Sequence, residues 1–115
     1  MKPGKYNIVC PQGSTLVLPM DYSTSGTLTN LSAYTARMQV RETHESETAT
    51  LTLTTENGGI VLSGTSPNIR IKVSASLTTP LKAKTYVYDL ELVDTIADPY
   101  RIMEGDFIVT REVTR

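Results

Sequence analysis

The sequence is poor in the residues from which chemical sites are built. It has one cysteine, one histidine, one phenylalanine and no tryptophan in 115 residues. A lone cysteine cannot form an internal disulfide, and with a lone histidine it cannot supply the several ligands of a structural zinc site. Stability must therefore come from packing alone, and synthesis in a reducing cytosol is expected. We predict no catalytic residue, no metal and no cofactor.

Long apolar runs and an excess of either charge are also missing. Lys and Arg total 11 against 12 for Asp and Glu, which leaves a formal charge of −1. Neither nucleic acid nor a membrane is expected as a partner, because no strong field and no spanning segment is encoded. The first apolar stretch, 8–10, ends at Pro11 and is shorter than the roughly 7–15 residues of a secretory signal. The length suits one domain over 1–115.

What the sequence does have is period-2 alternation from end to end. In 34–41 the even-numbered residues are Tyr, Ala, Met and Val, and the odd-numbered ones are Thr, Arg, Gln and Arg. Successive side chains leave opposite faces of a strand, so each such segment is predicted to be a strand with one buried face. The segments are 6–10, 16–22, 34–41, 49–54, 69–73, 86–92 and 100–109, of which the first two form one bent strand or two collinear ones.

Several residues interrupt or punctuate these strands. Pro19 cannot donate to a ladder and places its strand at a sheet edge. Between Tyr100 and Val109 the apolar phase changes, which predicts a β-bulge near Ile102 and Met103. Turn residues predict a tight hairpin at 56–59, between Thr54 and Ile60, and a second turn at 63–68. The segment 74–79 is predicted to form one helical turn with a serine cap, ended by Pro80.

Seven or eight short strands without intervening helices predict an all-β, immunoglobulin-like antiparallel β-sandwich with Greek-key connections. A helical crossover ahead of a Tyr-rich strand resembles the corner where a tyrosine bonds back to the upstream backbone, for which Tyr86 or Tyr88 is suitable. If 34–41 and 86–92 are neighbours, Arg37 and Arg41 can face acidic residues across the ladder, at Asp89 and Glu91.

Candidate sites are few and concern binding. His44 is predicted to lie in a solvated loop, and Cys10 to be a small buried hydrophobe. The outward Thr50, Thr52 and Thr54 form a flat uncharged face, which is explained by strand propensity or by docking. Pro19 marks a candidate edge contact. Tyr100 follows a predicted turn and is a candidate sugar-contacting residue.

The sequence resembles a known group of phage proteins in several segments: NLSAYTARMQVR (30–41), LTTENGGI (53–60), YVYDLEL (86–92), RIMEG (101–105) and VTREVTR (109–115). Together they resemble the immunoglobulin-like N-terminal domain of the phage upper-baseplate protein family. The resemblance consists of strand patterns and contains no catalytic motif. It implies a virion structural protein that acts as a tail, baseplate or fibre-attachment adaptor, made in the bacterial cytoplasm.

The resemblance has one departure and leaves alternatives. Family members continue into long fibre-binding regions, whereas this sequence stops at Arg115, so we expect contacts through loops, sheet edges or termini. Its partners would be other phage virion proteins, met in multiple symmetric copies. Capsid decoration is the nearest alternative role. A carbohydrate-binding module for host recognition is a further one, from a different functional class.

Overall fold

The computed structural model describes residues 4–111, and its regular structure is almost entirely strand. The elements, in chain order, are β1 (Gly4–Lys5), β2 (Ile8–Pro11), β3 (Leu16–Met20), β4 (Ser23–Thr24), β5 (Thr27–Leu28), β6 (Thr35–Arg41), β7 (Leu51–Thr54), β8 (Ile60–Leu62), β9 (Ile69–Val73), α1 (Ala75–Thr78), β10 (Thr85–Val93) and β11 (Pro99–Thr110).

The strands form where the sequence alternates. Along β6 and β9 every second residue is buried and its neighbours are exposed, and β10 buries Tyr86, Tyr88, Leu90 and Leu92. These inward residues meet between two sheets and form one core. Its largest fully buried members are Phe107, Ile8, Leu31, Met38, Leu53, Ile60, Ile69, Ile71, Leu90 and Leu92.

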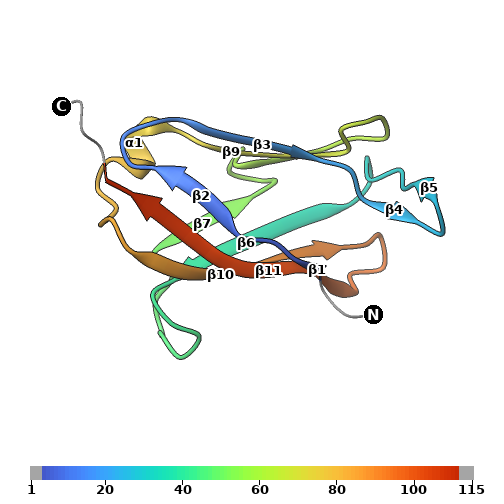
Figure 1. Ribbon diagram of the computed structural model, residues 1–115. Helices are drawn as coiled ribbons and strands as arrows, with labels where there is room; N and C mark the ends of the chain where they lie inside the picture. Colours follow the sequence, from blue (N-terminus) through green and yellow to red (C-terminus); the bar gives the residue numbers. More distant parts are fainter. Residues whose placement is uncertain (1–3, 112–115) are drawn as a thin grey trace.

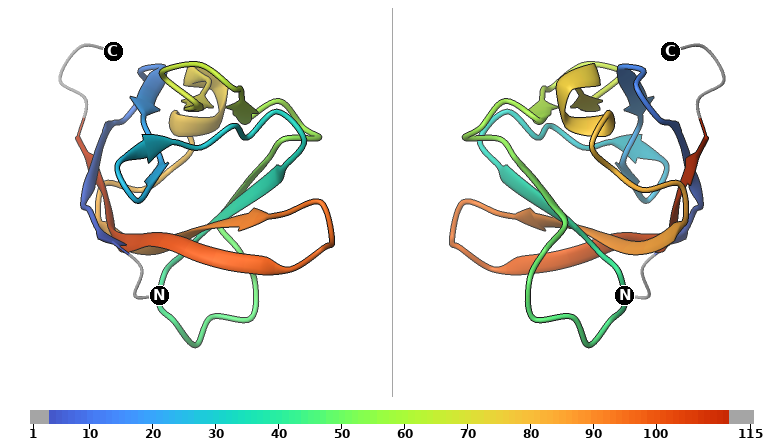
Figure 2. Two further views of the ribbon diagram at one scale, coloured as in Figure 1. Left: turned by 90° about the vertical axis from the view of Figure 1, so that its right-hand side faces the viewer. Right: turned by 90° about the vertical axis from the view of Figure 1, so that its left-hand side faces the viewer.

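Two sheets pack face to face (Figure 1). The large sheet has the order β1-β11-β10-β6-β7, with β2 also paired to β11, and the small sheet has the order β3-β9-β8. The chain crosses between the sheets after β2, β3, β7 and β9, which is the Greek-key pattern of an immunoglobulin-like sandwich. The predicted fold class is therefore confirmed. Viewed end on, the sheets form two layers, with α1 beside the small sheet (Figure 2).

The N-terminal segment departs from the antiparallel rule. β1 and β2 run parallel to β11 in one continuous register, from Gly4 opposite Met103 to Pro11 opposite Thr110. The chain then turns and enters the small sheet as β3. The segments 6–10 and 16–22 are thus neither one bent strand nor collinear strands, because each ends up in a different sheet.

Gly105 and Tyr88 hold this N-terminal segment against β11. A Cβ on Gly105 would lie 2.3 Å from the carbonyl oxygen of Tyr6. The Tyr88 hydroxyl donates to the same carbonyl, and the amide of Tyr6 donates to the carbonyl of Glu104 at 3.0 Å. Only a glycine at position 105 leaves room for this approach. Tyr6 itself is 49% exposed, although it shares the alternation phase of the buried Ile8 and Cys10.

The predicted bulge in the last strand is confirmed. Leu90 is opposite Met103, but the next residue of β10, Glu91, is opposite Arg101. Ile102 is the extra residue, as the change of apolar phase indicated. Later in β11, the side chains of Phe107 and Val109 point into the core again.

The predicted hairpin at 56–59 is wrong. β7 belongs to the large sheet and β8 to the small one, so this segment is a crossover between layers. Gly58 has a positive φ of 83°, as a tight turn requires, but Gly59 is needed for space, since a Cβ there would lie 2.7 Å from the Leu53 side chain. Turn residues fix the bend but not the sheet to which the next strand belongs. The turn at 63–68 does join a hairpin, between β8 and β9.

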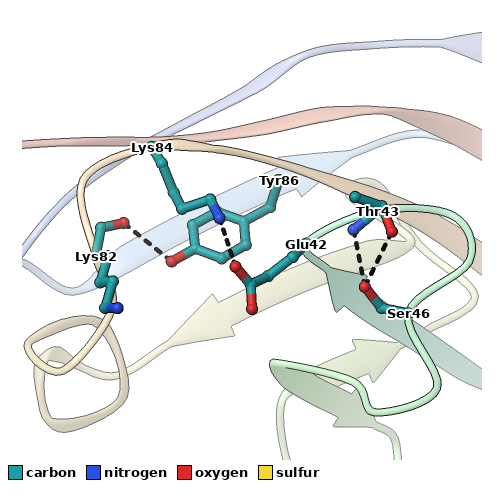
Figure 3. A network of polar contacts seen from close by, with 6 residues as sticks. All are labelled: Glu42, Thr43, Ser46, Lys82, Lys84 and Tyr86. Carbon is teal, nitrogen blue, oxygen red and sulfur yellow. Dashed lines mark hydrogen bonds and ion pairs between the residues drawn. The ribbon is translucent and has the colours of Figure 1, made fainter.

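The helical turn and the tyrosine corner are both present. α1 begins after Ser74, but the Ser74 hydroxyl contacts the Ser76 hydroxyl and does not cap the helix, which corrects the predicted serine cap. The Tyr86 hydroxyl donates to the carbonyl of Lys82 at 3.0 Å, four residues upstream (Figure 3). Tyr86 is therefore the corner tyrosine.

One short hairpin, formed by β4 and β5, was not predicted from the sequence. β4 and β5 pair through two residues each, with Ser25 and Gly26 at positive φ between them. Asn68, which is fully buried, ties this hairpin to the small sheet. Its side-chain amide donates to the carbonyls of Tyr22 and Thr29, both at 2.8 Å, and its oxygen accepts the Tyr22 amide at 2.8 Å.

Candidate interaction surface

The predicted Thr face lies along the outer edge of the large sheet. Thr52 is opposite Gln39 and Thr54 is opposite Arg37, so their side chains point outward from the sheet. Thr50 and Thr52 also line a groove that we call the β7 groove. Its lining residues are Thr50, Leu51, Thr52, Leu53, Asn57, Gly58, Gly59, Lys72, Ser74 and Leu77.

The groove combines an exposed apolar side chain with a cation. Leu77, on α1, is 44% exposed. Lys72, on β9, is exposed and makes no ion pair with any residue in 4–111. β8 begins only at Ile60, so the residue beside Lys72 is the turn residue Gly59, whose carbonyl accepts the Lys72 amide at 2.9 Å. The sequence pattern singled out the threonines but not Lys72 or Leu77, which come from another sheet and from α1.

Asn57 closes the backbone edge of β7. Its side-chain oxygen accepts the amides of Thr54 and Gly59, both at 2.9 Å, and its amide donates to the carbonyl of Thr52 at 3.0 Å. The carbonyl of Thr52 and the amide of Thr54 face away from β6 and, without Asn57, would be available to an added strand. A partner at the Thr face would therefore meet side chains, not an open ladder.

Proline closes two other edges. The backbone amides of Tyr6 and Gln12 donate to β11, so the even-numbered residues of this segment bond to β11. The backbone groups of the odd-numbered residues between them, including Pro11, therefore face the open side of β2. On β3, Pro19 is opposite Arg70. The backbone amide of Lys72 bonds to Gly59, on the β8 side of β9, so the even-numbered residues of β9 bond towards β8 and the odd-numbered Ile69 and Ile71 bond to β3. Arg70 therefore forms no backbone bond with Pro19. Pro19 thus points its missing N–H outward, and the predicted edge position is confirmed.

Tyr100 is the second residue of β11, and the turn that joins β10 to β11 lies at the opposite end of the long strands from α1 (Figure 1). The residue is 47% exposed, and its hydroxyl donates to Asp94 Oδ2 at 2.7 Å. That bond raises the pKa of Tyr100 to about 12. Asp94 also accepts the amides of Ile96 and Asp98, each at 3.0 Å, which fixes a loop that presents Ile96. The structure does not bring Pro19 or Tyr100 to the β7 groove.

The outer face of the large sheet carries paired charges. Arg37 contacts Glu91 directly opposite, as predicted. The second predicted contact is wrong, because Asp89 is opposite Gln39 and pairs instead with Arg101 at 3.4 Å. Arg41 donates to the Ser46 carbonyl at 2.8 Å and to the Gln39 side chain at 2.7 Å. Such exposed pairs contribute about 0.2–1 kcal/mol each and mainly fix register.

The lone histidine and the lone cysteine, His44 and Cys10, lie in different surroundings. His44 is exposed on the loop after β6, which projects from the sandwich (Figure 1). Cys10 is fully buried, and that burial raises the pKa of its thiol. Within 4–111 there is no group of three or more His, Cys, Asp or Glu side chains placed to hold a metal ion. No helix in the same range is long and apolar enough to cross a membrane.

A separate cluster braces the His44 loop against the corner. Glu42 accepts a hydrogen bond from Lys84, whose ammonium lies 5.4 Å from the centre of the Tyr86 ring (Figure 3). The bond lowers the pKa of Glu42 and raises that of Lys84. Thr43 donates its amide to the Ser46 hydroxyl at 3.1 Å. The cluster explains the shape of this loop without requiring a ligand.

No protein-family model and no curated protein sequence matches the chain. Solved structures do show likeness in fold. One is an extracellular domain of the voltage-gated sodium channel beta4 subunit, from a study of parallel homodimers and cell-cell adhesion. It is 16% identical to this chain, the match covers 98% of this chain and 97% of that one, and the TM-score is 0.48. Murine CRIg has 9% identity, 92% coverage of both chains and a TM-score of 0.43. Extracellular domains 3–5 of Drosophila OTK have 12% identity, coverage of 91% and 32%, and a TM-score of 0.37.

Proposed function

We propose that the protein is a non-enzymatic structural protein of a tailed-phage virion, an adaptor of the tail, baseplate or fibre-attachment region. The sequence resemblance supplies the phage setting. The observation that carries the binding role is the β7 groove, in which predicted interface residues meet an exposed leucine and a lysine that forms no ion pair within the described residues. An adaptor needs such a side-chain surface on a rigid scaffold.

The groove defines the chemistry of its occupant. Leu77 offers apolar area, Lys72 offers a cation, and Thr50 and Thr52 offer hydroxyls. A protein segment that carries one apolar side chain and one carboxylate would satisfy all of these groups. Because Asn57 occupies the edge of β7, this segment would bind across the groove and would not extend the sheet.

Two exposed threonines of the large sheet provide a matched pair of variants to test this role. Thr52 lines the groove, whereas Thr35, on β6, does not. We expect purified phage particles to contain the protein by mass spectrometry. We expect Thr52→Lys to reduce its incorporation about tenfold through steric and charge clash, and Thr35→Lys to leave it unchanged. Absence from purified particles, or equal incorporation of both variants, would contradict the proposal.

Particle imaging separates the adaptor from its nearest alternative. Labelled protein in rings at the tail supports the adaptor, whereas labelled protein in a shell lattice supports capsid decoration. Both outcomes keep the structural class and change only the location.

A carbohydrate-binding role is favoured by one observation, the exposed ring of Tyr100 beside the Asp94 loop. Sugars stack on such rings while a neighbouring polar group binds hydroxyls. A glycan array with wild type, Tyr100→Ala and the equally exposed control Tyr6→Ala tests this role. Binding lost only in Tyr100→Ala supports it, and an array without signal removes it.

A further inference from the structure

The turn between β10 and β11 presents an apolar side chain to solvent. Ile96 is 75% exposed, the largest exposed fraction among the large apolar residues of 4–111. The carboxylate of Asp94 fixes the turn, because it accepts the amides of Ile96 and Asp98. Ala97 has a φ of 66°, which residues other than glycine rarely adopt, and its amide donates to the Asp94 carbonyl at 3.1 Å. A loop already held in one conformation loses little entropy when it binds.

The same turn is acidic. Segment 94–99 contains two aspartates and no Lys, Arg or His. The Asp98 carboxylate forms no ion pair within 4–111. Arg101, the first cation after the turn along the chain, pairs with Asp89 at 3.4 Å and lies 3.7 Å from Glu104. The turn therefore offers an apolar side chain next to a carboxylate that has no cationic partner among the described residues.

The β7 groove has the opposite charge. Lys72 is the only charged residue among the described residues that line it, and it forms no ion pair with them or with the rest of 4–111. Glu56 precedes the lining residue Asn57 but does not line the groove, and its carboxylate accepts the Thr55 hydroxyl at 2.8 Å. The groove has a volume of about 510 Å³, within the roughly 300–1,000 Å³ of pockets that hold a ligand.

The turn carries what the groove requires of its occupant, an apolar side chain and a carboxylate. Inside the turn the Asp94 amide donates to the Asp98 carbonyl at 3.1 Å, so the turn meets a partner with side chains, as the closed edge of β7 requires. The other exposed large apolar residues lie on strands, between two strands or in the groove itself: Val9, Val17, Val61, Tyr100, Tyr6 and Leu77.

We propose that the β10–β11 turn of one copy binds in the β7 groove of a second copy, with Ile96 against Leu77 and Asp98 beside Lys72. The turn lies at the opposite end of the long strands from α1, whose Leu77 lines the groove, so one copy can use both sites at once (Figure 1). Such a contact is heterologous and either closes into a ring or continues as a filament. It rests on the proposed function, because it names the occupant of the β7 groove.

A dilution series followed by amide NMR tests the contact at both of its sites. One turn in one groove is a small contact, so we expect a Kd of about 0.1–1 mM. Over that concentration range the amides of 94–98 should shift together with those of 50–53, 57–59 and 72–77, while those of β2 stay unchanged. Wild type without concentration-dependent shifts, or with shifts confined to other segments, would overturn the proposal.

The apolar part of the contact is tested by Ile96→Ser. The backbone of Ile96 makes the bond to Asp94, so the variant keeps the shape of the turn. We expect it to weaken association at least tenfold, because the anchor side chain is lost. Val9→Ser, at an exposed apolar residue of β2, is the control and should associate as wild type does. Equal association of wild type and Ile96→Ser would overturn the proposal.

The charged part is tested by reversal. Lys72→Glu and Asp98→Lys should each weaken association at least tenfold, because each places like charges in the contact. Lys82, which lines a separate hollow with Gln12 and Arg111, provides the control Lys82→Glu, which should behave as wild type. Thermal melts establish that each variant is folded.

Mixing the two charge-reversed variants is the decisive measurement. The reversed groove of Lys72→Glu then faces the reversed turn of Asp98→Lys, and the unchanged groove and turn also match. The mixture should therefore associate as wild type does, although neither variant does so alone. A mixture that associates no better than its components would overturn the pairing of Lys72 with Asp98.

Incorporation into particles separates this contact from the proposed function. If both hold, Ile96→Ser should be incorporated about tenfold less than wild type, as is expected of Thr52→Lys. Normal incorporation of Ile96→Ser together with loss of Thr52→Lys would mean that a different virion protein fills the groove, which overturns the contact and keeps the proposed function. Association through the turn and the groove by a protein absent from purified particles would keep the contact and overturn the proposed function.

Discussion

The two sheets use their polar residues in different ways. On the large sheet, outward charges pair across strands, as in Arg37 with Glu91 and Arg101 with Asp89. On the small sheet, the outward cations Arg70 and Lys72 form no ion pair within 4–111, while Asn68 is buried at one end and makes its hydrogen bonds there. The large sheet thus pairs most of its outward charges with one another, whereas the small sheet is held by a buried residue and leaves its outward cations available. Partner contacts are therefore expected first at the small sheet and at the groove beside it.

The largest effect is expected where the small sheet is held from within. Asn68→Ala would remove three buried hydrogen bonds, to the amide and the carbonyl of Tyr22 and to the carbonyl of Thr29. We expect a loss of about 3 kcal/mol in the free energy of unfolding, measured by urea denaturation. The control Asn30→Ala removes one exposed bond, to the Ser32 amide, and should cost well under that amount. Equal losses would show that the buried amide does not hold the small sheet.

The next effect concerns the edge of the large sheet. Gly105→Ala would place a methyl group against the Tyr6 carbonyl, so β1 and β2 must move away from β11. We expect a loss of about 2 kcal/mol in stability, with faster hydrogen exchange confined to the amides of 5–10. At Gly4 an added Cβ has only an ordinary contact of 3.6 Å, so Gly4→Ala is the control. Unchanged exchange in Gly105→Ala would contradict the close approach.

A smaller effect tests the surface charges themselves. A double-mutant cycle on Arg37 and Glu91 should give a coupling of about 0.5 kcal/mol that falls in high salt, since both side chains are partly exposed. Arg70→Gln and Lys72→Gln, measured on the monomer, should leave stability within about 0.5 kcal/mol of wild type. A substantial loss from either glutamine variant would mean that the small sheet also uses its outward cations internally.

The smallest effect is a pH dependence at the β10–β11 turn. The Asp98 amide and the Tyr100 hydroxyl hold the pKa of Asp94 below its ordinary value of 3.8. A lowered carboxyl pKa stabilises the fold above the ordinary value, and this contribution is lost as the pH falls through the folded-state pKa. Asp94→Asn should therefore lose less stability than wild type between pH 5 and 3, in melts that use Asp98→Asn as the control on the same loop. If wild type and Asp94→Asn lost the same stability between pH 5 and 3, the lowered pKa of Asp94 would be contradicted.

Most of the fold could be predicted from alternation, because burial on one face of a strand leaves a direct mark on the sequence. The same signal predicted the bulge near Ile102 and Met103, whereas the edge position of Pro19 followed from its missing N–H, and the corner tyrosine was narrowed only to Tyr86 or Tyr88. Sheet membership left no such mark. The turn at 56–59 and the segment 12–15 reverse the chain in ways that local residues permit, but the sheet that receives the next strand is decided by core packing over long distances.

The candidate surface was predicted less completely for a related reason. Thr50 and Thr52 share one strand and could be recognised together, whereas Lys72 and Leu77 join them only after the two layers pack. Asn57 and Asn68 were missed because each acts through backbone groups of other segments, and backbone groups carry no sequence signal. Alternation shows which residues point outward, and it does not show which outward residues meet.

The parallel pairing of the N-terminal segment with β11 has a mechanical consequence. Gly4 and Arg111 lie at opposite ends of this pairing, because Gly4 is opposite Met103 and Arg111 follows Thr110, which is opposite Pro11 (Figure 1). A pull on these two points runs along the strands, so it loads the hydrogen bonds between 4–11 and β11 together in shear and not one after another. The Gly105 contact and the Tyr88 hydroxyl lie within that loaded segment. The pairing is therefore arranged to resist tension applied along these strands.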